Sequence, residues 1–178
     1  SITALQNGKE ILLTGDIFIS SMPLKDLIAG MNDVPKNIQR IANGLPYRDF
    51  LTIGLLVKKV HFESQPKIKD TWIYVQEPKI QMGRIQVFNN WSPYLVKNPK
   101  TYFLGLEYFC TENDSFWNKK DRELKNFAVR ELCDMGIIKE DDVLGYHVER
   151  VPKAYPAYFD TYSEIDQLQT FLNTIPNL

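Results

Sequence analysis

The sequence predicts an α+β fold in which a mixed, largely antiparallel sheet of about six to eight strands is covered by about four helices. Two observations carry this expectation. Runs of alternating or continuous apolar residues typical of strands are interspersed with segments at helical spacing. These segments do not alternate as regular βαβ units, which favours an α+β fold with a largely antiparallel or mixed sheet. With 178 residues, of which 44% are hydrophobic, the chain is long enough to bury a core.

The first sixty residues contain hairpin, strand and helix signals in turn. Asn7-Gly8 predicts a tight turn between strands at residues 2–5 and 10–14. The short apolar run at 17–20 is typical of a buried strand, and Pro23 fits the first turn of a helix. A second helix is expected over 35–43. Residues 47–60 form the longest predicted strand, in which Gly54 indicates a bulge or a close backbone approach.

The middle of the chain is organised around residues 84–94, a strand that stops on Asn-Asn-Trp-Ser-Pro. This sequence should deliver amides and a large ring to a strand end. Further strands are predicted at 72–75, 101–110 and 143–151, and the strand at 101–110 has strict alternation between two faces. A helix is expected over 120–135 with Gly136 ending it, and residues 161–164 match a capping box that would open a last helix.

Composition excludes several functional classes. The formal net charge is −1, so a basic surface for nucleic acid is not expected. Two cysteines and two histidines are too few for a disulfide framework or for a His/Cys metal site, and no metal is predicted. No apolar stretch reaches the ~20 residues of a membrane span. We expect a cytoplasmic protein with free thiols.

Catalytic signatures such as GxSxG, a P-loop, HExxH and GxGxxG are missing from the sequence. Amphipathic aromatic residues and forked or amide donors near strand ends are present instead, and these are binding chemistries. The candidate substrate-binding residues are Arg84, Asn90, Trp91, Tyr108, Arg150, Lys153, Tyr155 and Tyr158. Such a set without a nucleophile fits a binding module or the substrate half of a cofactor enzyme.

Several segments together carry a family resemblance. Residues 15–24, GDIFISSMPL, resemble the aDxVIsSmPl segment of flavin-dependent amine-oxidase-like proteins, which include protoporphyrinogen oxidases and UDP-galactopyranose mutases. Other segments resemble a bacterial branch described as FAD/NAD(P)-dependent oxidoreductases or mutase-like proteins: residues 47–52, 72–74, 83–86, 90–93, 105–109 and 150–156.

The resemblance implies that FAD binds the intact protein. A GxGxxG turn and a C-terminal glycine motif hold the cofactor in this family, and neither occurs between Ser1 and Leu178. Residues 1–178 would thus be a single substrate-binding domain fragment from the middle of a longer protein. Within it, residues 1–30 would contain elements that pack on the FAD-binding domain. The parent would be an FAD-dependent oxidoreductase or mutase, and the isolated chain would be inactive and bind no cofactor.

The resemblance also implies roles for the candidate residues toward a small or nucleotide-sugar-like substrate. In the mutases, arginine and tyrosines hold the nucleotide-sugar, and Arg150, Tyr155 and Tyr158 lie in a similar context. Trp91 would line the cavity with these tyrosines, beside the flavin ring. Arg84, Arg150 and Lys153 would hold an anionic group.

Two alternatives remain open from the sequence. The first is a stand-alone carbohydrate- or nucleotide-binding module without catalysis, which predicts ligand binding without flavin. The second is a scaffold or interaction domain whose exposed aromatic residues form an interface, which predicts concentration-dependent self-association.

Overall fold

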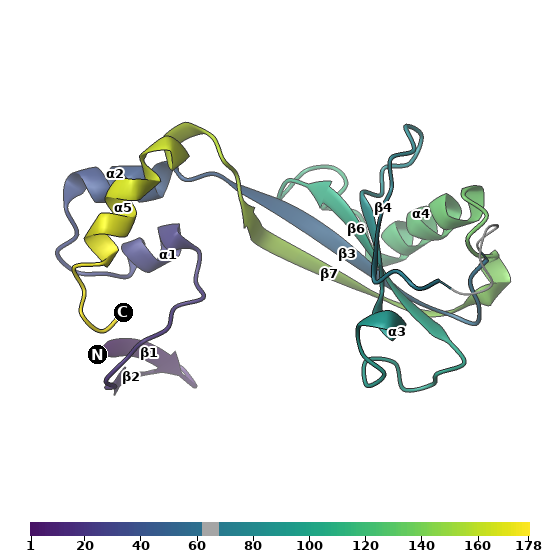
Figure 1. Ribbon diagram of the computed structural model, residues 1–178, viewed down its shortest axis with the longest axis horizontal. Helices are drawn as coiled ribbons and strands as arrows, with labels where there is room; N and C mark the ends of the chain where they lie inside the picture. Colours follow the sequence, from purple (N-terminus) through teal and green to yellow (C-terminus); the bar gives the residue numbers. More distant parts are fainter. Residues whose placement is uncertain (62–67) are drawn as a thin grey trace. The chain divides into compact units, whose positions relative to one another are not determined.

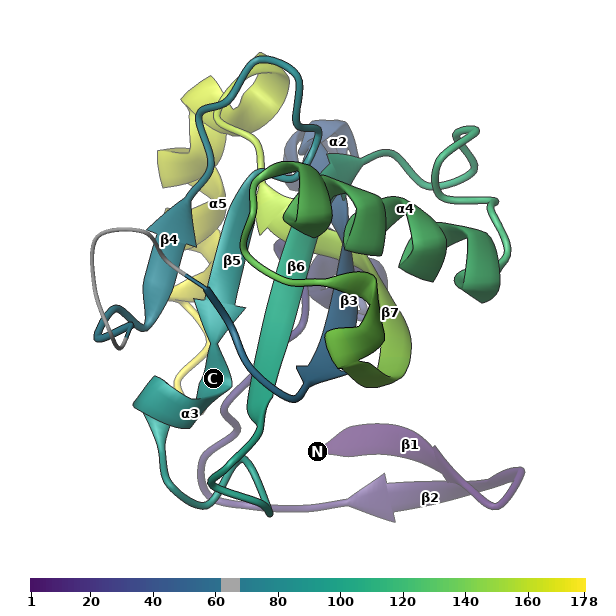
Figure 2. The same cartoon turned by 90° about the vertical axis from the view of Figure 1, so that its right-hand side faces the viewer.

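The computed structural model describes residues 1–61 and 68–178 and divides into two compact units. Unit 1 combines Ser1–Pro46 with Pro156–Leu178, and unit 2 is the continuous segment Tyr47–Tyr155. Figures 1 and 2 together label the helices and strands of both units. The α+β prediction is confirmed: a five-stranded antiparallel sheet and a two-stranded hairpin combine with five α-helices in the described residues. The main sheet has fewer strands than the six to eight expected, because β1 and β2 pair with each other as a separate hairpin.

Unit 2 is built on the five-stranded sheet. The strands lie in the order β4-β5-β6-β3-β7, and the registers of β4 with β5, β5 with β6 and β3 with β6 are antiparallel (Figure 2). Their bounds are β3 Tyr47–Val57, β4 Trp72–Tyr74, β5 Arg84–Val87, β6 Tyr102–Cys110 and β7 Val143–Pro156. Alternate residues of each strand face opposite sides of this sheet, so each side has its own chemistry.

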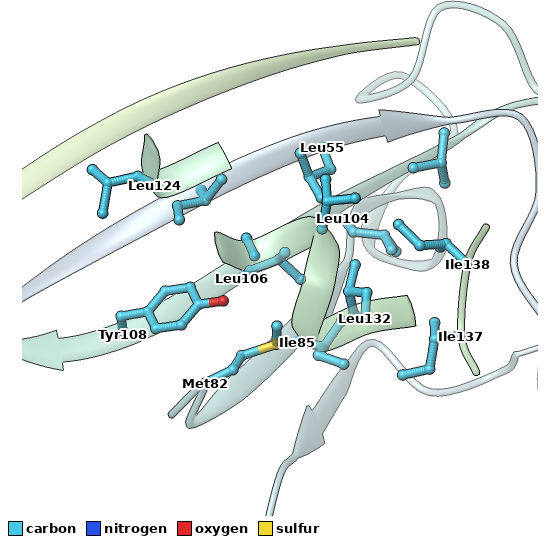
Figure 3. Close-up of a cluster of buried hydrophobic side chains, with 14 of the residues drawn as sticks. Leu55, Met82, Ile85, Leu104, Leu106, Tyr108, Leu124, Leu132, Ile137 and Ile138 are labelled. Carbon is cyan, nitrogen blue, oxygen red and sulfur yellow. The ribbon is translucent and has the colours of Figure 1, made fainter. Parts of the chain in front are cut away.

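One side of the sheet forms the core with helix α4 (Asp121–Asp134). The predicted alternation in β6 is confirmed, since Leu104, Leu106 and Tyr108 are fully buried on this side. Leu124 and Leu132 of α4 pack in the same cluster (Figure 3). Burying an aliphatic side chain of this size contributes ~1.5–3 kcal/mol, so this layer is the main source of stability in unit 2.

The ends of α4 follow from local sequence. The Glu123 carboxylate accepts a hydrogen bond of 3.0 Å from the Lys120 backbone N–H, which satisfies a donor before the first turn. At the other end Gly136 takes φ +71°, as predicted for a terminating glycine. Its N–H donates to the Cys133 carbonyl. A 3₁₀ turn at Glu140–Asp142 then leads into β7.

Unit 1 contains the predicted hairpin and a small helical cluster. Strands β1 (Ile2–Gln6) and β2 (Lys9–Leu13) pair through a turn in which both Asn7 and Gly8 have positive φ. This is the conformation that favours Asn-Gly in hairpins. Helices α1 (Leu24–Ala29), α2 (Lys36–Gly44) and α5 (Ile165–Leu172) bury their apolar stripes, with Ile28, Ile41 and Leu168 among the buried residues.

Two local predictions are wrong. Residues 17–20 form no strand: Ile17 and Ile19 are exposed. Residues 161–164 lie in a 3₁₀ turn, Asp160–Glu164, because the Thr161 hydroxyl donates to the Ile41 carbonyl instead of capping a helix, and α5 begins at Ile165. At Gly54 one of the two predicted alternatives is confirmed: the register is unbroken, so there is no bulge, and a Cβ there would come 2.8 Å from the Phe103 ring, which marks a close approach. Among the described residues, no helix is long and apolar enough to cross a membrane.

Candidate binding face

The second side of the unit 2 sheet, which we call the aromatic face, carries polar groups and large rings. It is formed by Phe50, Trp72, Tyr74, Arg84, Gln86, Glu107, Phe109 and Tyr155. Strand register brings its centre together, because Tyr74 pairs with Arg84, and Arg84 pairs with Glu107 on the next strand. Directly opposed residues on antiparallel strands lie within side-chain contact. The same register places Ile73, Ile85 and Leu106 in a row on the core side.

A buried ion pair forms the centre of the aromatic face. Arg84 Nη2 lies 2.5 Å from Glu107 Oε2, and the two residues are 8% and 1% exposed. Arg84 also donates a 3.0 Å hydrogen bond to the Tyr155 hydroxyl, and the Gln86 amide donates to Glu107 Oε1. Desolvating two charges is costly, so such a pair persists only when its geometry and hydrogen bonds compensate.

Four rings surround the Arg84 guanidinium. Its central carbon lies 4.9 Å from the Trp72 ring centroid, 5.1 Å from that of Phe109, 5.5 Å from that of Tyr155 and 5.9 Å from that of Tyr74. These distances fall in the range of cation–π attraction. The rings cover the charge while remaining between 36% and 69% exposed themselves. The face therefore presents aromatic surface to solvent above a buried, paired charge.

The electrostatic environment keeps Arg84 charged. Burial acts to lower the pKa of Arg84, but the hydrogen bond to Tyr155 and the charge of Glu107 raise it above its usual value. Arg84 Nε is buried without an acceptor among the described residues. A buried donor of this kind costs ~1–3 kcal/mol when unsatisfied, so ring packing and the ion pair must hold the guanidinium in place.

Glycines let rings lie close to the backbone of the sheet. A Cβ on Gly83 would come 2.7 Å from the Phe109 ring, and one on Gly105 would come 2.8 Å from the Phe88 ring. Both contacts are shorter than real Cβ atoms adopt, so the rings occupy the space that a side chain would need. Gly83 thus leaves room for the Phe109 ring directly beside the buried Arg84.

The Asn-Asn-Trp segment after β5 forms one helical turn, α3 (Phe88–Trp91), where we predicted a strand end and turn. Asn90 donates to the carbonyls of Ile68 and Asp70, so its amide fixes neighbouring backbone. Trp91 is 48% exposed, and its ring meets Trp72 edge-on with centroids 5.9 Å apart. Trp91 therefore adjoins the aromatic face, whereas the side-chain amide of Asn90 is used in bonds to the backbone of residues 68 and 70.

Other predicted site residues have structural partners. Arg150 donates from Nε to the Trp117 carbonyl, from Nη1 to the Asp121 carboxylate and from Nη2 to the Lys119 carbonyl. These bonds tie β7 to the turn that precedes α4. Lys153 has φ +53°, and its backbone N–H donates to the Asp49 carboxylate. This bond stabilises a backbone conformation that is unusual for a residue with a side chain.

Tyr108 lies on the core side of the unit 2 sheet, and Tyr158 belongs to unit 1. Tyr108 is fully buried on the α4 side, where its hydroxyl donates a 2.8 Å bond to Glu131. Burial and the Glu131 charge raise the pKa of Tyr108 well above its usual value. Tyr158 belongs to unit 1, is 76% exposed and packs edge-on against Tyr162. Of the seven predicted residues in unit 2, Arg84, Trp91 and Tyr155 meet at or beside one face.

Sequence reasoning did not select Trp72, Tyr74, Phe109 and Glu107 as site residues. Glu107 and Phe109 belong to the same alternating face of β6, which was visible in the sequence. The pairing that brings Tyr74 and Trp72 beside them depends on strand register, for which the sequence held no signal. No group of three or more metal-ligating side chains occurs among the described residues.

Comparisons with known proteins support the fold. No model of a known protein family matches the chain, and no curated protein matches it. A crystal structure of reduced UDP-galactopyranose mutase superposes with a TM-score of 0.72 at 21% identity, covering 97% of this chain. A putative protoporphyrinogen oxidase from Exiguobacterium sp. 255-15 gives 0.62 at 15% identity and 99% coverage.

This chain has the fold of the matching part of those two proteins. The predicted resemblance is thereby confirmed at the level of fold. The chain spans 37% of the length of the mutase structure and 39% of the length of the oxidase structure.

Proposed function

We propose that this chain is the substrate-binding part of a flavin-dependent oxidoreductase or mutase-like enzyme. The observation that carries the proposal is the aromatic face, where half-exposed rings surround the buried pair of Arg84 and Glu107. Half-exposed aromatic rings on a firm backbone stack well against flat or sugar-like ligands. The fold shared with a mutase and a putative oxidase supports the flavoenzyme context.

The residues of this chain fit the substrate side of such an enzyme better than the cofactor's phosphate site. Its sequence has no glycine-rich GxGxxG turn, which is the element that holds a dinucleotide pyrophosphate at a helix N-terminus. FAD would bind the intact protein through other segments and supply the redox or covalent chemistry. Within this chain, Trp72, Trp91 and Tyr155 would orient the substrate and exclude water from one of its sides.

Exposed apolar residues at the start of the chain support a second part of the proposal. Ile2, Leu5, Leu12, Ile17 and Ile19 are between 46% and 94% exposed. Unpartnered apolar surface of this kind is typical of an interface with another domain. We therefore place residues 1–30 against the FAD-binding domain of the parent protein.

The test uses the longest reading frame that contains this chain. We expect the purified product to carry bound flavin, detected by its visible absorbance. Trp91→Ala should alter the absorbance or fluorescence of the flavin or its response to substrate candidates such as UDP-galactose. Tyr94→Ala is the matched control, because Tyr94 is 95% exposed and belongs to the same loop region. A longer protein without flavin would refute the proposal.

The stand-alone sugar- or nucleotide-binding module remains the second candidate. The observation in its favour is that Trp72 and Trp91 expose adjoining rings, a geometry that suits stacking on a sugar. This candidate predicts ligand binding by a protein that carries no flavin in any length of the reading frame. The same purification therefore separates the two functions.

A further inference from the structure

The two arginines that sequence reasoning assigned to an anionic ligand are already engaged within the protein. Arg84 is paired with Glu107 and lies beneath four rings with 8% exposure. Arg150 uses Nε, Nη1 and Nη2 in bonds to Trp117, Lys119 and Asp121. Arg150 would have to give up these bonds to fork onto a phosphate. A phosphate could reach Arg84, including its Nε that lacks an acceptor, only by displacing the rings that cover it.

The centre of the aromatic face carries no net charge. The positive charge of Arg84 and the negative charge of Glu107 lie 2.5 Å apart, so their fields largely cancel beyond the pair. The faces of the surrounding rings carry a negative quadrupole, which repels anions. A phosphate or carboxylate placed over these rings would lose water without gaining a free cation in return.

The solvent-facing part of the aromatic face is made of flat apolar surface with polar tips. Trp72 is 36% exposed, Tyr155 38%, Phe109 45% and Tyr74 69%, and all four rings lie within 6 Å of one guanidinium carbon. Rings gathered in this way bury a planar partner by stacking and edge contacts. The chemistry available to a ligand here is therefore neutral and aromatic.

We infer that the aromatic face binds an uncharged planar ring, and that it does not hold the phosphate or carboxylate of an anionic substrate. This inference rests on the proposed function, since it names the class of substrate that this site takes. It also distinguishes the chain from a site organised around a nucleotide-sugar diphosphate. Any charged portion of a larger substrate would lie beyond the aromatic face, and the ring alone would determine affinity there.

The test follows the tryptophan indole N–H signals of the ¹⁵N-labelled 178-residue chain by nuclear magnetic resonance. Trp72 and Trp91 report on the aromatic face, and Trp117, 9% exposed and bonded through its carbonyl to Arg150, serves as the internal control. The probes are coumarin, uridine and UDP; uridine and UDP differ only by the diphosphate. We expect coumarin and uridine to shift the Trp72 signal, and UDP to bind within about twofold of uridine.

Two variants locate the binding. Tyr74→Ala should weaken coumarin and uridine binding at least about fivefold, because it removes the most exposed ring of the face. Tyr94→Ala should leave both affinities unchanged, since Tyr94 is 95% exposed and is not among the rings around Arg84. Dispersed indole and amide signals in each variant verify that it is folded.

Two results would overturn the inference. One is UDP binding at least about tenfold tighter than uridine, with an affinity that falls as salt rises, because that pattern marks a free cation in the site. The other is the failure of both uncharged probes to shift Trp72. Flavin in the longer protein is measured separately. If flavin is present and UDP binds tightly, the proposed class of ligand is refuted and the proposed flavoenzyme function stands. If uncharged rings bind and no flavin is present, the flavoenzyme function is refuted and the proposed class of ligand stands.

Discussion

Replacing Glu131 by alanine should strongly destabilise unit 2. This carboxylate lies on α4, is 6% exposed and accepts bonds from the Gln81 N–H at 2.5 Å, the Met82 N–H at 3.3 Å and the Tyr108 hydroxyl at 2.8 Å. Alanine would leave the Met82 amide and the Tyr108 hydroxyl without this acceptor inside the core. Each unsatisfied buried donor costs ~1–3 kcal/mol, so we expect a total loss of about 3–5 kcal/mol.

Urea unfolding of Glu131→Ala, followed by the amide signals of unit 2, measures this loss directly. Tyr108→Phe removes one donor together with its bond and should cost only ~1 kcal/mol. Arg122→Ala, an exposed change on the same helix, should stay within about ±0.5 kcal/mol. The double variant Glu131→Ala with Tyr108→Phe should be less destabilised than the sum of the single changes. A loss below about 1 kcal/mol for Glu131→Ala would refute this account of the network.

Three further predictions concern the sheet and one turn. Arg84→Met should lower the free energy of unfolding in urea by about 3–5 kcal/mol, because it leaves the buried Glu107 charge without its partner. Adding Glu107→Met should recover most of that loss, and no recovery would contradict the ion-pair account. Gly54→Ala should lower the free energy of unfolding by ~1–3 kcal/mol in a thermal scan, because its Cβ would come 2.8 Å from the Phe103 ring. The control Gly145→Ala places its Cβ in open space and should be neutral or stabilising in the same scan. Hydrogen bonds from three backbone N–H groups lower the pKa of Asp114 in the folded state. The ionised carboxylate therefore stabilises the fold above about pH 4, and this stabilisation is lost as pH falls through the lower native pKa. Asp114→Asn should flatten the acid limb of the curve of unfolding free energy against pH, and an unchanged limb would exclude the effect.

Much of the fold could be predicted because local and tertiary preferences agree. The alternation in residues 101–110 correctly assigned one face of β6 to the core, and Asn7-Gly8 correctly located the hairpin. The strand predicted at residues 17–20 does not form, because an apolar run becomes a strand only when the edge of another strand is available to pair with it. In the structure the Phe18 N–H of this run donates to the Asn177 carbonyl at 2.8 Å. The capping box predicted at Thr161 does not form: its hydroxyl donates to the Ile41 carbonyl, and neither the 3₁₀ turn nor α5 has a side-chain cap bond.

The candidate site was harder to predict than the fold. Arg84, Trp91 and Tyr155 were selected for their chemistry, and they lie at or beside one face. Residue chemistry alone could not show that Arg84 already had a partner, since Glu107 reaches it only through the register of β5 with β6. The same limit applies to Arg150, whose binding partners lie about thirty positions earlier in the chain.

The order of segments in unit 1 has a consequence for how the chain acquires its structure. Pro46 and Ala157 are joined by a 2.9 Å backbone bond, and the buried Ile41 and Leu168 belong to opposite ends of the sequence. During synthesis on the ribosome, α2 emerges long before α5, so the apolar stripe of α2 cannot pack against α5 until the end of the chain has been made. Unit 2 is one continuous segment and can fold during that interval. Once folded, it reduces the length of flexible chain between the two segments of unit 1 and so lowers the entropy cost of bringing them together. Mutations that slow unit 2 should therefore also delay unit 1, whereas mutations in α5 should leave the earlier step intact.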